Sequence, residues 1–499
     1  MMKQTGTAFR LALLLLAALL AVGLVACRKT GDDPATGSTG STGGTSGPDL
    51  TEEEELLELP EGLDFDYAEF RILARGDADY YNEELYFADG ASGSAVDQAV
   101  FRRQARIEEN YFVEMSMSTL GEAAIDTYMN VNSLAAGLED TYHLVANHGR
   151  NSTNYVINAL TADWNLLPYT NLDASWWNQD ARQQWTAVSG SIYMMTGDIS
   201  YLSVGQAVGM FFNKTIINNA GLVTPYERVR NGEWTFEVFR EYVTTTDANL
   251  NGDNSGNLAT DSFGYVTGWW RGPMNIIYST GQHWLEVTED SISVIPSTAN
   301  NLVNAFDDYF DLLFDSGACA MGGGDYTSMS KALEEGRATF YDEIVLRAET
   351  LKQTELDFGL VPMPKYDSTV DGYYTFVNAA TNTFVIPRIV TTDAATAEMA
   401  SVVLECMAYY GQKEVLPTYY EDILTYNSMT DMDSVEMMGV IRDSLSYDLG
   451  YYLDEGAGGN VCDTGYIMAS ERAARGFVTV YESLRNLGDA RIEDWLDLA

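Results

Sequence analysis

Short apolar runs alternate with segments of helical periodicity along most of this chain, and this alternation constrains its fold most strongly. The runs at 70–74, 142–146 and 358–361 are each closely followed by Gly, Asn or Pro, as buried strands are. Apolar residues recur at helical spacing over 96–111 and 394–410. The alternation predicts an α/β fold with mostly parallel sheets, in which ligands bind at the carboxyl ends of the strands.

The chain opens with an apolar leader. Residues 11–26 are almost entirely Leu, Ala and Val, and Lys3 and Arg10 precede them. A charged start, an apolar stretch and small residues before a cleavage point are typical of a secretory signal, and the run is too short to span a bilayer comfortably. Cys27 follows a Leu-Val-Ala triplet that resembles a bacterial lipobox, so we expect Cys27 to carry a lipid such as palmitate after cleavage. The alternative is a plain signal peptide with an incidental cysteine.

The composition divides the chain into three regions. Residues 1–26 form the predicted signal peptide. Residues 27–63 are rich in Gly, Ser, Thr and acidic residues, and they predict a flexible linker behind the lipidated cysteine because they cannot bury enough apolar surface. Residues 64–499 are long enough to form two lobes with cores of their own. We therefore expect a folded body tethered to the extracytoplasmic face of the cell membrane.

The strongly acidic composition limits the partners. The chain carries 73 Asp and Glu against 28 Lys and Arg, a formal net charge of −45. Nucleic acid and anionic lipid surfaces require basic patches, so neither is an expected partner, whereas a neutral or cationic solute is compatible with the charge. Besides Cys27, the sequence has Cys319, Cys406 and Cys462, which permit at most one disulfide and leave its pairing open.

Seven short segments form an ordered set of motifs. Met-Phe-Phe-Asn-Lys at 210–214 is followed by Asn-Ala-Gly-Leu at 219–222, and Glu-Trp-Thr-Phe-Glu-Val-Phe stands at 233–239. The other four segments lie at 175–179, 195–200, 333–340 and 358–364. Together they resemble family 1 extracellular solute-binding proteins of bacterial ABC importers, and the first two of those four resemble the acidic lipoproteins of clostridia-like bacteria.

The resemblance implies a two-lobed periplasmic-binding-protein-like fold of type II, with a hinge that the chain crosses several times. It implies crossings near 203–206, 358–361 and 412–416. Lobe one would then hold 64–202 and 360–411, and lobe two would hold 204–359 and 412–499. The implied function is capture of a solute, expected to be an oligosaccharide, by a monomer that delivers it to ABC permease subunits. Such a protein is no enzyme and requires no cofactor.

The best candidate for a ligand contact is a Trp-Trp-Arg triplet. Trp269, Trp270 and Arg271 are bracketed by glycines; indoles stack on the CH faces of sugars, and a guanidinium donates to their hydroxyls. Adjacent side chains on an extended segment point oppositely, so we expect one indole to face the ligand, with Trp269 favoured by the resemblance. The further predicted ligand contacts are Asp79, Asn147, His148, Trp177, Tyr341, Asp342, Tyr374 and Asn378. For Trp177, a place in the lobe core is the equal alternative.

An oxygen-rich segment raises the question of a metal. The residues that would bind Ca²⁺ there are Asn249, Asn251, Asp253, Ser255 and Asp261. Their spacing does not satisfy the EF-hand pattern, and the same residue types favour polar turns. The sequence therefore leaves a structural Ca²⁺ ion and an Asx-rich turn as alternatives.

Three other functions compete with a receptor. A lipid-anchored hydrolase acting on glycans is one, because the many acidic residues could supply paired carboxylates. Against it, the sequence has three histidines and no HExxH, P-loop or GxSxG motif. A binding protein for a peptide or another non-sugar solute is the second, since one fold serves many solutes. A surface adhesin is the third.

Overall fold

The computed structural model describes residues 55–90, 92–132, 141–187, 189–247, 257–288, 290–426, 429–453 and 460–496. The predicted signal peptide, Cys27 and most of the predicted linker lie outside these residues. The chain divides into two compact units, and all of the described structure belongs to the second, Glu55–Ala499. No helix in the described ranges is both long and apolar enough to cross a membrane.

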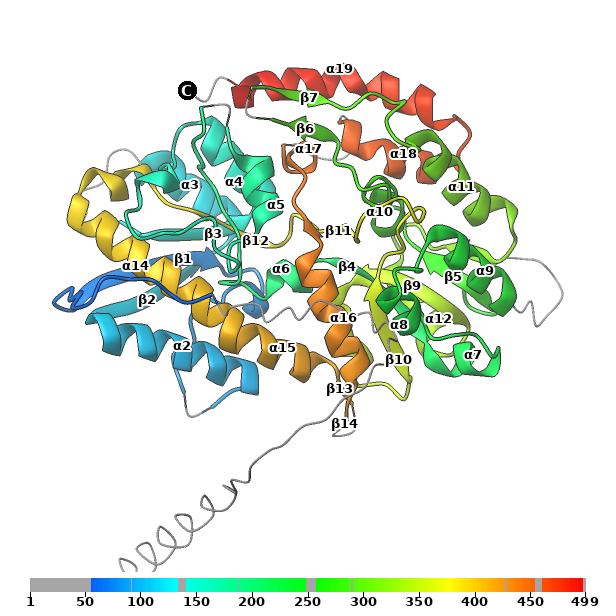
Figure 1. The fold of residues 1–499 in the computed structure, drawn as a ribbon, viewed down its shortest axis with the longest axis horizontal. Helices are drawn as coiled ribbons and strands as arrows, with labels where there is room; N and C mark the ends of the chain where they lie inside the picture. Colours follow the sequence, from blue (N-terminus) through cyan, green and yellow to red (C-terminus); the bar gives the residue numbers. More distant parts are fainter. Residues whose placement is uncertain are drawn as a thin grey trace, which may run out of the picture. The chain divides into compact units, whose positions relative to one another are not determined.

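The first lobe is built on a four-stranded sheet in the order β12-β3-β1-β2. Its strands are β1 (Ala68–Arg75), β2 (Val113–Leu120), β3 (Leu144–His148) and β12 (Asn382–Val385). β1 pairs in parallel with β2 and β3, whereas β12 pairs antiparallel with β3. Helices gather around this sheet in Figure 1, namely α2 (Ala95–Tyr111), α3 (Glu122–Asn132), α4 (Gly149–Ile157), α5 (Gln179–Trp185) and α14 (Ala394–Tyr410).

Local sequence explains the limits of α2. The hydroxyl of Ser94 accepts a hydrogen bond from the Asp97 amide at 3.1 Å, and the Asp97 carboxylate accepts one from the Ser94 amide at 2.6 Å. This capping box satisfies two amides that have no partner within the helix. The helix ends where Phe112 adopts a positive φ of 51°. The predicted helices at 96–111 and 394–410 are therefore confirmed as α2 and α14.

The second lobe is built on a five-stranded sheet in the order β10-β4-β9-β5-β8. Its strands are β4 (Val208–Asn213), β5 (Phe263–Thr267), β8 (Cys319–Met321), β9 (Ala338–Ile344) and β10 (Phe358–Pro362). β5 lies parallel to β8 and β9, while β4 runs antiparallel to β9 and β10. Because β10 pairs with β4 along its whole length, the return crossing predicted at 358–361 is wrong: this strand belongs to the second lobe.

The remaining helices and strands complete the two lobes. Before β9, they are α6 (Leu202–Gly205), α7 (Lys214–Asn219), α8 (Pro225–Arg230), α9 (Phe236–Thr246), α10 (Arg271–Ser279), β6 (Leu285–Val287), β7 (Ile292–Val294), α11 (Leu302–Asp315) and α12 (Tyr326–Glu334). After β9, they are α13 (Ala348–Leu351), β11 (Thr375–Phe376), α15 (Leu416–Ile423), β13 (Thr425–Tyr426), β14 (Met429–Thr430), α16 (Met432–Asp443), β15 (Leu445–Ser446), α17 (Leu449–Tyr452), α18 (Thr464–Ser470) and α19 (Phe477–Leu496).

Two chain crossings lie side by side at the hinge. The amide of Asn378 donates to the carbonyl of Gln206 at 3.0 Å, and Ala207 forms an antiparallel bridge with Val377. A third connection runs from α14 through a π-helical turn (Gly411–Val415) into α15. α15 packs on α2 of the first lobe, and α16 packs on β10 of the second. The chain therefore crosses between the lobes for the third time after α15, later than the predicted 412–416.

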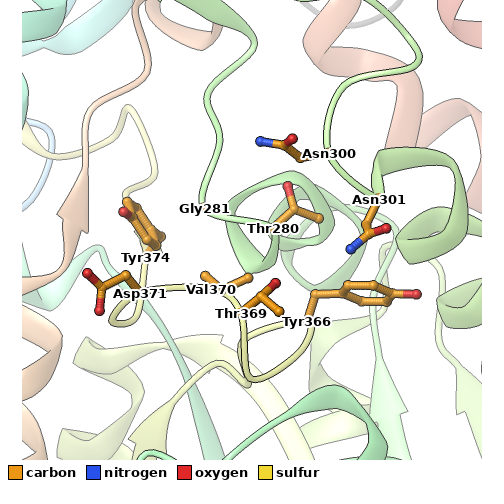
Figure 2. A pocket seen from close by; sticks show the side chains of 9 residues that line it. All are labelled: Thr280, Gly281, Asn300, Asn301, Tyr366, Thr369, Val370, Asp371 and Tyr374. Carbon is orange, nitrogen blue, oxygen red and sulfur yellow. The ribbon is translucent and has the colours of Figure 1, made fainter.

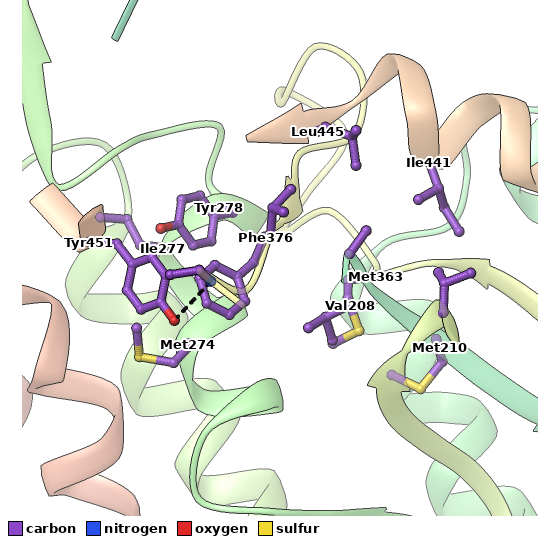
Figure 3. Close-up of a cluster of buried hydrophobic side chains, with 14 of the residues drawn as sticks. Val208, Met210, Met274, Ile277, Tyr278, Met363, Phe376, Ile441, Leu445 and Tyr451 are labelled. Atoms are coloured by element: carbon purple, nitrogen blue, oxygen red, sulfur yellow. Dashed lines mark hydrogen bonds between the residues drawn. The ribbon is translucent and has the colours of Figure 1, made fainter. Parts of the chain in front are cut away.

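A buried apolar cluster joins the hinge to the second lobe (Figure 3). The ring of Phe376 stacks on Tyr278 with centroids 5.5 Å apart and meets the edge of Tyr451 at 4.8 Å. The hydroxyl of Tyr451 also accepts a hydrogen bond from the Ala379 amide at 3.4 Å. Through these contacts, α10, β11 and α17 form one packed unit. None of Cys319, Cys406 and Cys462, all within the described ranges, forms a disulfide.

Candidate ligand-binding site

The candidate site lies at the carboxyl ends of two neighbouring parallel strands of the second sheet, β5 and β9. β5 ends at Thr267, and the loop that follows carries Trp269 and Trp270 before α10 begins at Arg271. β9 ends with Glu343 and Ile344. Crevices in α/β sheets form at this edge of the strands, so the fold brings the predicted Trp-Trp-Arg triplet to a place suited to a ligand.

A charged pair forms the polar part of the site. The Arg271 Nε lies 2.5 Å from the Glu343 Oε1, and the Glu343 side chain is 5% exposed. Glu343 also accepts hydrogen bonds from the Tyr341 hydroxyl at 2.6 Å and the Ile344 amide at 2.8 Å. The Arg271 guanidinium stands 4.0 Å from the centroid of the Tyr326 ring. A carboxylate and an aromatic face thus hold this guanidinium in one orientation.

The two adjacent indoles share one aromatic partner. Trp270 stacks on Tyr466 with centroids 4.6 Å apart and planes 19° apart, while Trp269 meets Tyr466 edge-on at 5.9 Å. Gly323, at a φ of +60°, lies so close to Trp269 that a Cβ there would come within 3.2 Å of the indole. Both indoles are half-buried and pack against the main core. Burial therefore does not assign either indole to the core, both keep an exposed part, and the choice of Trp269 as the ligand-facing indole stays a prediction.

These residues form what we name the aromatic site: Trp269, Trp270, Arg271, Tyr326, Glu343 and Tyr466. The predictions missed Tyr326, Glu343 and Tyr466. For Glu343 a signal existed, because side chains at positions 341 and 343 of a strand share a face. Nothing in the local sequence distinguishes Tyr326 and Tyr466 from the other 29 tyrosines of the 31 in the chain.

Tyr341 and Asp342, both predicted ligand contacts, are fully buried beneath the site. Tyr341 supports Glu343, as described above. Asp342 points to the opposite face of β9, where it accepts a hydrogen bond from the Tyr265 hydroxyl at 2.6 Å. Burial raises the pKa of Asp342 to about 7, although the Tyr265 hydrogen bond opposes the rise. Neither side chain is accessible in this structure, because β9 lies inside the sheet and helices cover it.

Asn147 and His148 lie where predicted, at the carboxyl end of β3, but both serve the local turn. Asn147 is fully buried; its amide group donates to the Tyr155 hydroxyl at 2.6 Å, and its Oδ1 accepts from the His148 amide at 2.8 Å. The His148 Nδ1 caps α4 by accepting from the Arg150 amide at 3.3 Å. Burial, together with Arg75 and Arg150, lowers the pKa of His148 to about 3, so this imidazole is neutral.

Trp177 takes the core alternative. It is 1% exposed, and its Nε1 donates to the Glu405 carboxylate at 2.9 Å, as does that of Trp176 at the same distance. Burial raises the pKa of Glu405 to about 7, against the effect of the two indole donors. Trp177 therefore packs in the core of the first lobe and also lines a hollow beside Asp180 and Arg442, but it is no part of the aromatic site.

The remaining predicted residues lie elsewhere. Asn378 is a hinge residue, and its Oδ1 accepts from the Ala380 amide at 3.0 Å. Tyr374 lines a separate hollow beside Gly281 (Figure 2). The side chain of Asp79 lies outside the described structure, as do Asn249, Asn251, Asp253 and Ser255. Asp261 is buried and accepts from the Asn257 amide at 2.8 Å. Within the described ranges, His, Cys, Asp and Glu form no cluster of three or more suited to a metal.

Contacts between the lobes lie close to α17. The Thr153 hydroxyl, on α4 of the first lobe, donates to the carbonyl of Tyr452 at 3.0 Å. The Arg150 guanidinium stands 4.5 Å from the centroid of the Tyr451 ring. Arg442, at the end of α16, forms a salt bridge with Asp198. In this conformation the lobes are therefore joined by hydrogen bonds, an ion pair and ring contacts.

The structure resembles solved structures of solute-binding proteins. An extracellular solute-binding protein from Staphylococcus aureus in complex with maltose matches with a TM-score of 0.58 and 8% identity, covering 85% of this chain and 98% of that one. The cyclic alpha-maltosyl-1,6-maltose binding protein of Arthrobacter globiformis matches with a TM-score of 0.53 and 12% identity, covering 87% and 99%. UgpB from Mycobacterium tuberculosis, in complex with glycerophosphocholine, matches with a TM-score of 0.50 and 11% identity, covering 86% and 98%.

The sequence matches no protein-family model and no curated protein. At these identities, the structural likeness shows the fold alone. The chain has the two-lobed α/β fold of the solute-binding proteins, so the predicted fold class is confirmed.

Proposed function

We propose that this protein is a solute-binding protein of an ABC importer, which captures a neutral saccharide outside the cytoplasmic membrane and delivers it to the permease. The observation that carries the proposal is the aromatic site. Two half-buried indoles and a pre-oriented Arg271–Glu343 pair lie together at the strand ends of a fold shared with saccharide-binding proteins. Indoles offer flat apolar faces to the CH groups of a sugar ring, and the charged pair offers polar contacts to its hydroxyls.

A buried donor without a partner at the site fits a hydroxyl group. The Arg271 Nη1 is buried and makes no hydrogen bond with any described residue. A sugar hydroxyl can accept a hydrogen bond, so it could satisfy this donor, which would otherwise be costly to bury.

The charge of the site favours a neutral ligand. Glu343 neutralises Arg271 at 2.5 Å, so the aromatic site has no uncompensated cation to bind a phosphate. This distinction matters because the fold alone does not decide the solute: UgpB, with the same fold, was solved with glycerophosphocholine. For this chain, the paired charges and the indoles support a saccharide.

Delivery to a permease accounts for the N-terminal sequence and the two lobes. A lipid on Cys27 and a linker would keep the body at the extracytoplasmic face of the membrane. A ligand that binds the joined conformation better would shift the population toward it, and a permease could then recognise both lobes of a monomeric receptor in that relation. The chain's net charge of −45 would repel the phosphates of nucleic acid, so we do not propose nucleic acid as a partner.

The direct test is intrinsic tryptophan fluorescence of the chain without its leader, titrated with neutral oligosaccharides and with glycerophosphocholine. We expect a saturable change with at least one oligosaccharide, none with glycerophosphocholine, and intact sugar in product analysis. Trp270→Ala should weaken binding about tenfold or more because it removes a stacking face. Arg388→Ala, an exposed arginine outside the site, is the matched control. Sugar products would instead indicate a hydrolase, and binding of peptides alone would refute the saccharide assignment.

A further inference from the structure

A hollow lies in the second lobe, at the opposite end of α10 from the aromatic site. Its volume is about 390 Å³, and it is formed by the end of α10, the turn before α11 and the loop between β10 and β11. α10 has nine residues, so the hollow and the aromatic site are separated by about 14 Å along the helix axis. Sites for small molecules usually have volumes of about 300–1,000 Å³, so this hollow is large enough for a small ligand.

Two tyrosine rings stand on either side of the hollow (Figure 2). Tyr366 is held from behind, because its hydroxyl donates to the Asp308 carboxylate at 2.8 Å. Tyr374 lies against Gly281, which has a φ of +74°; a Cβ at this position would come within 3.3 Å of both the Tyr374 ring and Val370. Each ring is half-buried. The hollow therefore has two aromatic walls whose positions are set by neighbouring contacts.

Hydrogen bonds behind the lining hold the loops in place. The Lys365 Nζ donates to the carbonyl of Val370 at 3.0 Å, and the Asp367 Oδ1 accepts from the Thr369 amide at 2.8 Å. The Gln282 Nε2 donates to the carbonyl of Asn300 at 3.1 Å. A ligand would meet a surface that is already ordered, so binding would cost little loop entropy.

Polar groups remain available on the inner surface. Asn301 uses its Nδ2 on Asp367 at 3.2 Å, which leaves its Oδ1 for a ligand. The side chains of Asn300 and Asp371 form no hydrogen bond or ion pair with any described residue. No Lys, Arg or His belongs to the described lining, whereas Asp371 contributes a carboxylate, so the lining does not favour an anion. Amide and carboxylate groups between two aromatic faces suit a neutral ligand with several hydroxyls.

We propose that this hollow, named here the accessory site, binds a neutral saccharide unit independently of the aromatic site. All of its lining residues precede the return crossing at 377–378, so they belong to the second lobe alone. Binding there requires no contact with the first lobe. The proposal goes beyond the receptor function, because capture and delivery of a solute require only one ligand site, for which the aromatic site suffices.

Equilibrium dialysis of the leaderless chain with radiolabelled maltose and cellobiose tests the proposal. We expect two classes of binding, and Asn300→Ala should weaken one of them about tenfold through the loss of a polar contact. Asn300 is exposed, so this change leaves the fold intact. Thr369→Trp, which fills the hollow, should abolish the same class. Asn218→Ala, an exposed asparagine on α7, is the matched control.

The aromatic-site variant Trp270→Ala separates the two proposals. Trp270→Ala should weaken saccharide binding at the aromatic site and leave binding at the accessory site unchanged. The two proposals can therefore be refuted separately. A single class of binding in the unaltered chain would overturn the accessory site. So would two classes that both survive Asn300→Ala and Thr369→Trp unchanged.

Discussion

The imidazole of His283 lies 3.1 Å from the carboxylate of Asp180, and the two side chains come from opposite sides of the first hinge crossing. Asp180 also accepts a hydrogen bond from the Tyr447 amide at 2.6 Å. Asp448, the other acidic group that acts on His283, accepts from the Trp284 amide at 2.6 Å. The contact between the lobes therefore contains an ion pair whose strength depends on protonation.

Stability should fall in alkaline solution because of this pair. Burial alone would lower the pKa of His283, but Asp180 and Asp448 raise it to about 9 from an ordinary value of 6.5. Since the folded state holds the proton more tightly, the stabilisation is complete below about pH 6.5 and is lost as the pH rises toward about 9. His283→Gln should therefore reduce the free energy of unfolding by on the order of 2 kcal/mol more at about pH 6 than at about pH 10, measured by urea titration.

His143→Gln is the control for that measurement. Burial lowers the pKa of His143 to about 4, so this imidazole is neutral across the whole interval. Because the unfolded chain takes up a proton at this site near pH 6 and the folded chain does not, His143→Gln should cost slightly less stability at about pH 6 than at about pH 10, by under about 1 kcal/mol, which is the opposite direction from His283→Gln. An equal effect of His283→Gln at both pH values would show that the ion pair with Asp180 does not form.

Glu343→Gln should change which ligands the aromatic site accepts. The substitution removes the negative charge 2.5 Å from Arg271 and leaves an uncompensated guanidinium beside the indoles. We expect saccharide affinity to fall about tenfold and weak binding of glycerophosphocholine to appear, both measured by calorimetry. Glu335→Gln, at an exposed pair with Arg337, should change neither property. Unchanged saccharide affinity in Glu343→Gln would remove the charged pair from the proposed site.

Gly149→Ala should disturb the packing of α17 against the first lobe. A Cβ on Gly149 would lie 2.2 Å from the Tyr452 ring, so the ring or the helix must move. We expect a loss of about 1–3 kcal/mol in the free energy of unfolding. Gly439→Ala on α16 is the matched control: nothing lies within 4 Å of its added Cβ, and helix propensity predicts a gain of about 0.5–1 kcal/mol. A gain in both variants would contradict the close contact.

Arg442→Met should destabilise the contact between the lobes strongly. The Asp198 side chain is 6% exposed and forms a salt bridge with Arg442, so the substitution leaves a buried carboxylate without its counter-charge. We expect a loss of about 3–5 kcal/mol, whereas Arg475→Met, at an exposed pair with Glu471, should cost less than about 1 kcal/mol. Thermal and urea unfolding of both variants provide the comparison, and equal losses would argue against the buried pair.

Local patterns predicted the elements of this fold correctly. The apolar runs at 70–74 and 142–146 and the helical periodicity at 96–111 correspond to β1, β3 and α2, because burial of one face is written into a short stretch of sequence. The Trp-Trp-Arg triplet also lies at a strand's carboxyl end, as expected. The prediction named Asp342 as a ligand contact and missed Glu343. In the structure, Glu343 contacts Arg271 and Asp342 lies on the opposite face of β9, as the alternation of side chains along a strand requires.

What the sequence by itself determined is the class of elements, their order, and one loop with the chemistry of a ligand site. Only the tertiary structure decided which sheet β10 joins and which side chains complete the site. Trp177 illustrates the reason: its indole is satisfied by Glu405, 228 residues away. A periodic pattern reports how a segment is buried, but the partner of a buried donor, cation or ring depends on contacts between segments remote in the chain.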